Sequence, residues 1–159
     1  MKIFMAFPFT QLCDARTGIL QERYIEFLNN LRNDLLCLGH SVFLAHYREG
    51  WGKEVMEPKE CTPADYEEMK NTDLVISFPG SPISGGVHIE LGWASAMSKK
   101  ILLLLNENQL YSPLVLGLHT ICDTEVIEYV DVFDSNFVHD AIILKVSNPL
   151  SYNNNLAQL

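Results

Sequence analysis

Residues 73–105 constrain the fold more than any other part of the chain, because two apolar runs flank a turn-rich loop and a helical pattern. The runs at 74–78 and 101–105 have the length and composition of strands that are buried on both faces of a sheet. Residues 79–86 between them are turn-formers, and a short helix is expected from residue 87 to about 98. This order predicts parallel strands in an α/β sheet.

The rest of the chain continues the alternation of strands and helices. Strands are predicted at 2–7, 41–45, 74–78, 101–105 and 124–129. Helices are predicted at 21–38, 62–71, 87–98, from about 112, and at 135–146. Thr62 and Pro63 have the types favoured at an N-cap and at the first helical position. We therefore predict one α/β domain over residues 1–159, a five-stranded parallel sheet with helices on both faces, with a loose tail at 147–159.

Composition limits the classes of partner. The formal net charge of −9 speaks against general affinity for nucleic acid, whose phosphates are gripped by clustered Lys and Arg. The short apolar N-terminus is interrupted by Pro8 without a cleavage site, so it is expected to be a strand and not a signal peptide. No apolar stretch approaches the roughly 20 residues that span a bilayer. A protein without membrane contact is expected.

Cysteines and histidines are scattered. The four cysteines form no C-x-x-C pair, and the five histidines form no H-E-x-x-H motif. This pattern favours reduced thiols in a cytoplasm over a disulfide framework, and it argues against a metal site. We expect a cytoplasmic protein that needs neither metal nor cofactor.

Ligands of parallel α/β sheets bind at the carboxyl ends of the strands. The loops expected at these ends, which should converge on one pocket, are 8–11, 46–51, 79–86 and 106–112. Ser84, Gly85 and Gly86 could cradle a phosphate at the following helix start, although an ordinary tight turn explains the same residues. The G-x-G-x-x-G motif is absent, while Glu107 after the next strand leaves a dinucleotide site open.

Two acidic residues each allow two interpretations. Glu90 lies about one turn into its helix, where a carboxylate stabilises the helix dipole by roughly 0.3–1 kcal/mol. Following a glycine-rich loop, it could instead attack the anomeric carbon of a sugar. Asp65 is either a dipole partner in the first turn of its helix or the second carboxylate of such a pair. Arg48 and Trp51 could contact a phosphate or a base, or be a solvated Arg and a half-buried Trp.

Several segments together resemble the nucleoside 2-deoxyribosyltransferase superfamily. They are PFTQL at 8–12, DARTG at 14–18, AHYREGWG at 45–52 and FPGSPISGGVHIELGWAS at 78–95. Within the superfamily, the chain is most similar to N-glycosidases of nucleoside 5′-monophosphates, of the cytidylate hydrolase type found in mildiomycin and blasticidin pathways. The similarity extends from residue 3 to about residue 117.

The resemblance implies a nucleotide pocket shared between the subunits of a homodimer. By position, Glu90 matches the nucleophile of the family, and Asp65 matches its second acidic residue near the base and leaving group. Ser84 and Gly86 match phosphate contacts. Ser112 matches a serine that the neighbouring subunit contributes to the phosphate.

Four further residues are assigned to the substrate by the resemblance: Phe4, Phe9, Thr10 and Arg48. Phe4 stands where deoxyribose-specific members carry Tyr, which implies a ribonucleotide. Thr10 stands where the hydroxymethyl-cytidylate enzyme carries Arg, which implies plain CMP.

The resulting hypothesis is hydrolysis of a pyrimidine ribonucleoside 5′-monophosphate, CMP, to free base and ribose 5-phosphate through a Glu90 glycosyl-enzyme. Three alternatives remain open at this point. The chain could transfer the (deoxy)ribosyl group to a second base, or hydrolyse deoxynucleoside 5′-monophosphates. It could also be a non-catalytic nucleotide-binding module.

Overall fold

Five parallel strands form one sheet in the computed structural model, which describes residues 1–80, 83–131 and 137–148. The strands are β1 (Lys2–Ala6), β2 (Ser41–Phe43), β3 (Leu74–Ser77), β4 (Lys100–Asn106) and β5 (Thr124–Tyr129). Their order is β2-β1-β3-β4-β5, and each neighbouring pair is parallel. The predicted five-stranded parallel sheet is confirmed.

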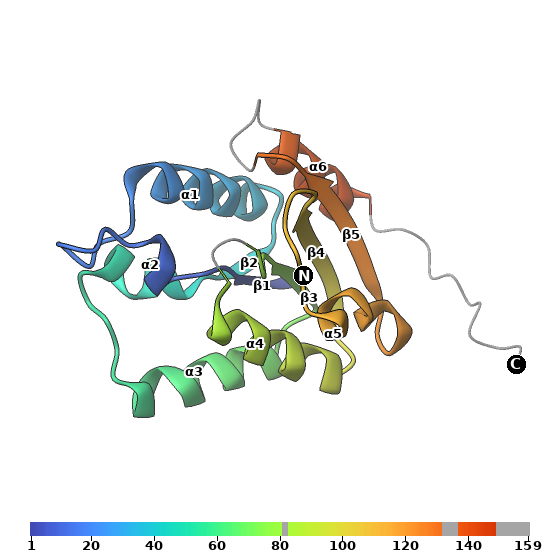
Figure 1. The fold of residues 1–159 in the computed structure, drawn as a ribbon, viewed down its shortest axis with the longest axis horizontal. Coiled ribbons are helices and arrows are strands. Elements are labelled where there is room, and N and C mark those ends of the chain that lie inside the picture. The colour runs from blue at the N-terminus through green and yellow to red at the C-terminus, as the bar shows by residue number, and fades with distance from the viewer. Residues whose placement is uncertain (81–82, 132–136, 149–159) are drawn as a thin grey trace, which may run out of the picture.

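Helices cover both faces of this sheet (Figure 1). They are α1 (Glu22–Cys37), α2 (Ala45–Arg48), α3 (Pro58–Lys70), α4 (Gly85–Ala96), α5 (Pro113–Leu116) and α6 (Phe137–Ser147), with short 3-10 turns η1 (Thr10–Leu12), η2 (Gly50–Gly52) and η3 (Leu118–Thr120). Because side chains alternate along a strand, Ile3 and Met5 join the apolar cluster beneath α1 and α6. Phe4 and Ala6 join the cluster beneath α3, α4 and α5.

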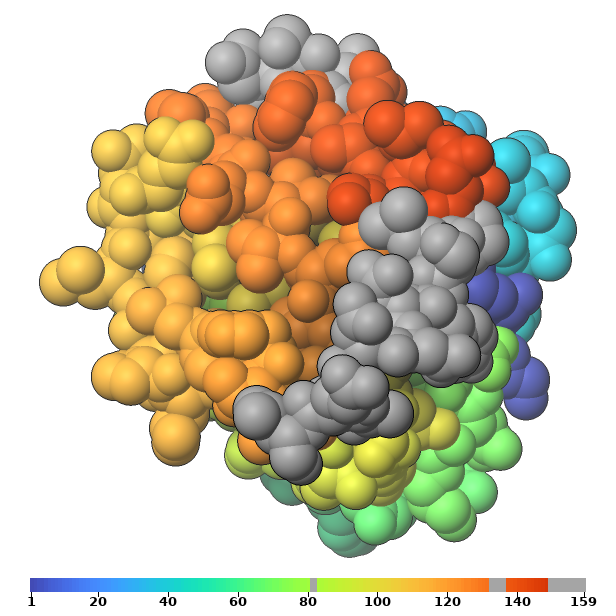
Figure 2. Space-filling view, turned by 90° about the vertical axis from the view of Figure 1, so that its right-hand side faces the viewer, coloured from blue at the N-terminus to red at the C-terminus, as the bar shows by residue number. Residues whose placement is uncertain are grey.

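β5 is an edge strand, and it forms much of the surface seen in Figure 2 together with the segment between β4 and β5. Among the described residues, no helix combines the length and apolar character that crossing a bilayer requires. The predicted loose tail beyond residue 148, residues 81–82 of the predicted loop and the predicted start of the last helix at 135 lie outside the described residues.

The segment after β2 differs from its prediction as a strand to residue 45 followed by a loop. β2 ends at Phe43, and the chain then forms α2 and η2. Trp51 has a left-handed backbone with φ of 62°, between two glycines that also have positive φ. A Cβ on Gly52 would lie 2.5 Å from the carbonyl oxygen of Gly18. Four-residue helices carry too little periodicity to be found in a sequence, which explains the difference.

The start of α3 also differs from the prediction. The helix begins at Pro58 with Glu57 as its N-cap, and it continues through Pro63. Pro58 occupies the early helical position that proline prefers, whereas the sequence pattern had assigned this position to Pro63. Pro63 has no N–H, so α3 lacks one backbone hydrogen bond at this residue but continues through it. Asp65 therefore lies in the second turn, so its interpretation as a first-turn dipole partner is wrong.

Candidate active site

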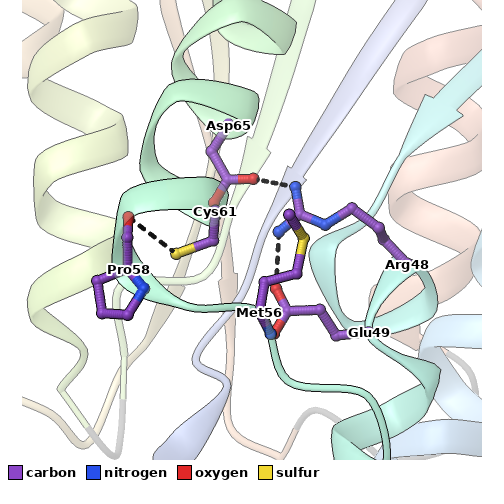
Figure 3. Close-up of polar contacts among 6 residues, drawn as sticks. All are labelled: Arg48, Glu49, Met56, Pro58, Cys61 and Asp65. Carbon is purple, nitrogen blue, oxygen red and sulfur yellow. Dashed lines mark hydrogen bonds and ion pairs between the residues drawn. The ribbon is translucent and has the colours of Figure 1, made fainter.

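The Arg48 guanidinium lies between two carboxylates at the end of α2 (Figure 3). Its Nη1 donates to Asp65 Oδ1 at 2.6 Å, and its Nη2 donates to Glu49 Oε1 at 2.7 Å. The side chains of Arg48, Asp65 and Glu49 are 23%, 16% and 9% exposed. Charge-assisted hydrogen bonds in such a partly desolvated place are stronger than those between neutral groups. Arg48 thus fastens α2 to α3.

Glu90 is placed by the packing of α4. Val87, Leu91 and Ala94 are buried against the sheet at helical spacing, which fixes the rotation of the helix. Glu90 is partly exposed and lies in the second turn, on the same helix face as Gly86 four residues earlier. Beside it, the Trp93 ring meets Tyr66 of α3 edge-on, with ring centroids 5.2 Å apart. This contact holds α3 and α4 together at the residues that follow Asp65 and Glu90.

The two acidic residues are coupled electrostatically. The pKa of Glu90 is raised to about 8, first by burial and then by the negative charge of Asp65, while Arg48 opposes the rise. Burial also raises the pKa of Asp65, against the lowering effect of the Arg48 hydrogen bond. Glu49 and Glu68 add to the rise at Asp65. The single positive charge of Arg48 therefore interacts with the carboxylates of Glu49, Asp65 and Glu90. Because one positive charge cannot balance three negative charges, at least one of these carboxyl groups tends to keep a proton.

The start of α4 carries the predicted phosphate contacts. Ser84 is the N-cap, and its Oγ accepts a long hydrogen bond of 3.5 Å from the Val87 N–H. The Ser84 carbonyl accepts a hydrogen bond of 2.7 Å from His88 Nδ1. Gly86 is exposed, and backbone N–H groups in the first turn of a helix have no partner within the helix. The structure thus places Ser84 and Gly86 at a helix start that suits an anion, one turn before Glu90.

The loop after β1 is held by a buried histidine. His46 Nε2 donates to the Pro8 carbonyl oxygen at 2.8 Å, and the His46 ring stacks on Phe9 with centroids 4.5 Å apart. Burial lowers the pKa of His46 to about 4, so the ring is neutral. Thr10 is exposed in the turn that follows. Phe9 and Thr10 are therefore attached to α2, the helix that carries Arg48.

Phe4 and Ser112 are the two predicted residues whose surroundings differ most: Phe4 is buried on β1, and Ser112 is exposed at the start of α5. Phe4 is only 1% exposed, so it offers almost no surface to a ligand in this conformation. The ring centroids of Phe4 and Phe43 are 4.9 Å apart, and the Arg48 guanidinium lies 5.3 Å from the centroid of the Phe43 ring. Phe4 therefore contacts Arg48 only indirectly, through Phe43. Ser112 is the exposed N-cap of α5, and its Oγ accepts from the Leu114 N–H at 3.3 Å.

Sequence reasoning assigned no role to Glu49 and His46. Both residues lie in a segment that was quoted for its resemblance, but neither belongs to a motif with a chemical meaning of its own. Their contacts with Arg48 and Pro8 arise from tertiary packing, and proximity to Arg48 in the chain is the only signal. Across the part of the chain that the structure describes, no three His, Cys, Asp or Glu residues are grouped so as to hold a metal ion.

Comparison with solved structures places the chain in a family. It is 38% identical to BlsM, known from a solution structure, over 99% of this chain and 97% of that one, with a TM-score of 0.76. It is 33% identical to the Clostridium botulinum CMP N-glycosidase BcmB over 94% of this chain and all of that one, with a TM-score of 0.67. The chain belongs to the CMP N-glycosidase family. This result confirms the resemblance found in the sequence and identifies the chain as an N-glycosidase.

A more distant structure shares the fold of this N-glycosidase family. A conserved protein from Enterococcus faecalis V583 is 16% identical over 94% of this chain and 99% of that one, with a TM-score of 0.66. At this level of identity the likeness concerns the fold alone. No protein-family model and no curated protein matched the chain.

The raised pKa of Glu90 predicts how stability depends on pH. A carboxyl with a folded-state pKa of about 8, against an ordinary 4.5, stabilises the fold below pH 4.5 and loses this contribution as the pH rises through 8. Glu90→Gln does not titrate. Its free energy of unfolding relative to wild type should therefore increase by about 1–3 kcal/mol between pH 4 and pH 9.

Urea denaturation at a series of pH values measures this difference. Glu26→Gln, on the exposed side of α1 at the opposite face of the sheet, corrects for the loss of a carboxylate in general. A difference between Glu90→Gln and wild type that is the same at every pH would contradict the prediction.

Proposed function

We propose that the chain hydrolyses the N-glycosidic bond of a pyrimidine ribonucleoside 5′-monophosphate, with CMP as its substrate, to free base and ribose 5-phosphate. The packing of α3 against α4, which brings Glu90 and Asp65 close enough for their charges to interact, is the observation that carries this proposal. It supplies the two carboxylates that glycoside cleavage uses. The family relation to BcmB, which is named as a CMP N-glycosidase, supports the choice of CMP.

The reaction runs in two displacements. The Glu90 carboxylate attacks C1′, the bond from C1′ to the base nitrogen breaks, and the base leaves with a proton that Asp65 supplies directly or through water. Water then attacks C1′ of the glycosyl-enzyme, and the Glu90 carboxylate is released with ribose 5-phosphate. Neither step requires a metal or a cofactor.

A shared proton supports both roles. Glu90 has a pKa of about 8 partly because Asp65 is charged, so a proton that moves to Asp65 makes Glu90 easier to ionise. Arg48 lowers the pKa of both carboxyl groups, so it stabilises the single negative charge whether that charge is on Asp65 or on Glu90. The state with ionised Glu90 and protonated Asp65 combines a nucleophile with a proton donor, which is the separation of roles expected of a catalytic carboxylate pair.

The start of α4 supports binding of the nucleotide phosphate. Gly86 and Glu90 share one face of the helix and are separated by about 6 Å along its axis. We assign the phosphate to Ser84 and the Gly86 N–H, which would fix the ribose with C1′ near Glu90. Thr10 is assigned to the base edge, and Phe4 to the choice of ribose, both by resemblance to the family. The net charge of −9 is consistent with a small-molecule substrate and not a nucleic acid.

A panel of ribo- and deoxynucleoside 5′-monophosphates, assayed for free base, tests the reaction. Wild type should release cytosine from CMP fastest. Glu90→Ala should lose at least about 10³-fold in kcat because no nucleophile remains, and Asp65→Asn about 10²- to 10⁴-fold because the proton donor is lost. Glu67→Gln, an exposed substitution on the same helix as Asp65, is the matched control and should keep wild-type activity.

Each alternative predicts a different result in the same assay. Unchanged turnover by Glu90→Ala would overturn the mechanism. Formation of a new nucleotide when a foreign base is added would identify a transferase, and faster release from dCMP would identify a deoxynucleotide enzyme. Binding of intact CMP without any release of base would identify a binding module.

The proton shared by the two carboxylates predicts the alkaline limb of the pH profile. The kcat/KM for CMP should fall as the pH rises through about 8, because Glu90 and Asp65 are then both ionised and no proton is left for the base. Asp65→Asn removes the group that holds the proton for the base, together with the part of the rise in the Glu90 pKa that comes from the Asp65 charge, so its residual activity should lack this limb. Wild-type kcat/KM that stays level or increases from pH 8 to pH 10 would show that the pair holds no essential proton.

We also propose a homodimer in which Ser112 reaches the phosphate site of the neighbouring subunit. Exposed apolar side chains precede and follow Ser112 in the segment after β4, and others lie on β5 and directly after it. They are Leu110, Leu114, Leu116, Ile121, Val126 and Val130, of which Leu110 and Leu114 are 94% and 84% exposed. An apolar patch of this kind at a sheet edge is typical of an interface, and two copies of one patch form a symmetric dimer.

Substitutions in the patch test the dimer. Leu114→Lys should give a monomer in analytical ultracentrifugation and a large loss of CMP hydrolysis, because a charge is placed in the contact. Ser112→Ala should remain dimeric and raise KM. Leu38→Lys, an exposed apolar position at the end of α1 and outside the patch, is the control. Wild type that is monomeric and fully active would overturn the assignment of Ser112.

A further inference from the structure

Glu49, the partner of Arg48 in Figure 3, makes contacts through both its side chain and its backbone. It is buried, and its Oε1 accepts from Arg48 Nη2 at 2.7 Å while its Oε2 accepts from the Met56 N–H at 3.2 Å. Its backbone carbonyl accepts from the N–H groups of Gly52 at 3.0 Å and Glu54 at 3.1 Å. The chain from Gly50 to Met56 therefore folds around Glu49.

The backbone around Glu49 is fixed independently of Arg48. Trp51 is held in the left-handed region, which costs a residue other than glycine on the order of 1 kcal/mol or more and requires support from neighbouring structure. The support comes from the Leu20 N–H, which donates to the Trp51 carbonyl at 2.9 Å, and from the close approach of Gly52 to Gly18. The Glu49 carboxylate is thus attached to a segment of backbone whose conformation is fixed.

Arg48 needs such an anchor. An arginine side chain has several rotatable bonds, and its Nη groups are able to turn toward any carboxylate nearby. Nη2 is occupied by Glu49, so Nη1 is left for Asp65 at 2.6 Å. A buried ion pair contributes little net stability, because desolvation of the charges offsets their attraction. The contribution of Glu49 therefore lies in where it places Arg48.

We propose that Glu49 is a positioning residue for the reaction, which holds the Arg48 guanidinium against Asp65 so that Asp65 stays in place to assist departure of the base. This inference rests on the proposed function, since the departing base defines what Asp65 must reach. Glu49 itself touches neither substrate nor reacting atoms. Its effect passes through Arg48.

Several charges act on this group. Asp65 is influenced by Arg48, Glu49 and Glu68, and Glu90 is influenced by Asp65 and Arg48. Glu49 also acts on the buried His46. The negative charge of Glu49 raises the pKa of Asp65, whereas the hydrogen bond and the charge of Arg48 lower it more strongly. The pKa of Asp65 should therefore rise when Glu49 no longer holds Arg48, and it should fall only where Arg48 keeps its place without Glu49.

A double-mutant cycle separates positioning from a purely structural role. Glu49→Gln keeps the shape and an acceptor for the Met56 N–H but loses the charge that holds Arg48. Its kcat for CMP should fall roughly 10- to 100-fold, with KM within about twofold, as expected when a catalytic group is misplaced. In an Arg48→Met background the same substitution should have no further effect. Glu54→Gln removes a charge from the same loop without touching Arg48, and it should match wild type.

Two outcomes of the cycle would overturn the inference. One is wild-type kcat in Glu49→Gln. The other is an equal loss from Glu49→Gln in the wild-type and Arg48→Met backgrounds, which would show that Glu49 acts through the loop alone. Should Glu49→Gln not fold, as judged by circular dichroism, Glu49→Asp takes its place. It keeps the charge but withdraws it by one methylene, and its kcat should be reduced while the coupling to Arg48→Met remains.

A titration that needs no turnover decides the inference separately from the proposed function. Carboxyl ¹³C NMR of Asp65 should show a higher pKa in Glu49→Gln than in wild type, because Arg48 is no longer held against Asp65 and its lowering effect is lost. An unchanged or lower pKa of Asp65 would show that Arg48 keeps its place without Glu49 and would overturn the inference. Wild type that releases no base from any monophosphate would overturn the proposed function, and the titration would still report on Glu49.

Discussion

A single guanidinium shared among neighbouring carboxylates is the interaction on which the site depends. Arg48 is bound by Glu49 and Asp65, and its charge also reaches Glu90. With all three acids ionised, this part of the molecule would carry more negative than positive charge in a place with little water. The arrangement is therefore more stable with a proton retained than with all three acids ionised. The packing of α2, α3 and α4 thus both pairs Arg48 with Glu49 and Asp65 and raises the pKa of Glu90.

The elements that the sequence predicted well are those whose signals are local. The buried strands consist of continuous apolar residues, and the long helix α1 has a clear amphipathic period, so both were located to within a few residues. Ser112 and Pro113 marked the start of α5 correctly for the same reason. Predictions failed where two local signals competed, as with Pro58 and Pro63 in α3, or where the element was too short to show a period, as with α2.

The site was predictable in part. Glu90 and Asp65 were chosen by resemblance, since spacing alone favoured the dipole explanation, and the structure brings their charges together. The partners of Arg48 were not predictable, because they depend on how α3 packs beside α2. Phe4 was expected next to the sugar, but its place on a central strand buries it beneath Phe43. Residues that act through other residues leave little trace in a single sequence.

The close approach of Gly52 to Gly18 joins two loops that are more than thirty residues apart. The backbone at Gly18 and the backbone at Gly52 are in such close contact that a shift of one displaces the other. The segment after β1 and the segment after α2 should therefore move together. An insertion or a bulkier residue in either segment would be transmitted to Glu49 and, from there, to the charges of the site. The shape of the loop around Gly18 therefore constrains the position of Glu49, although Gly18 itself contacts none of the charged groups named above.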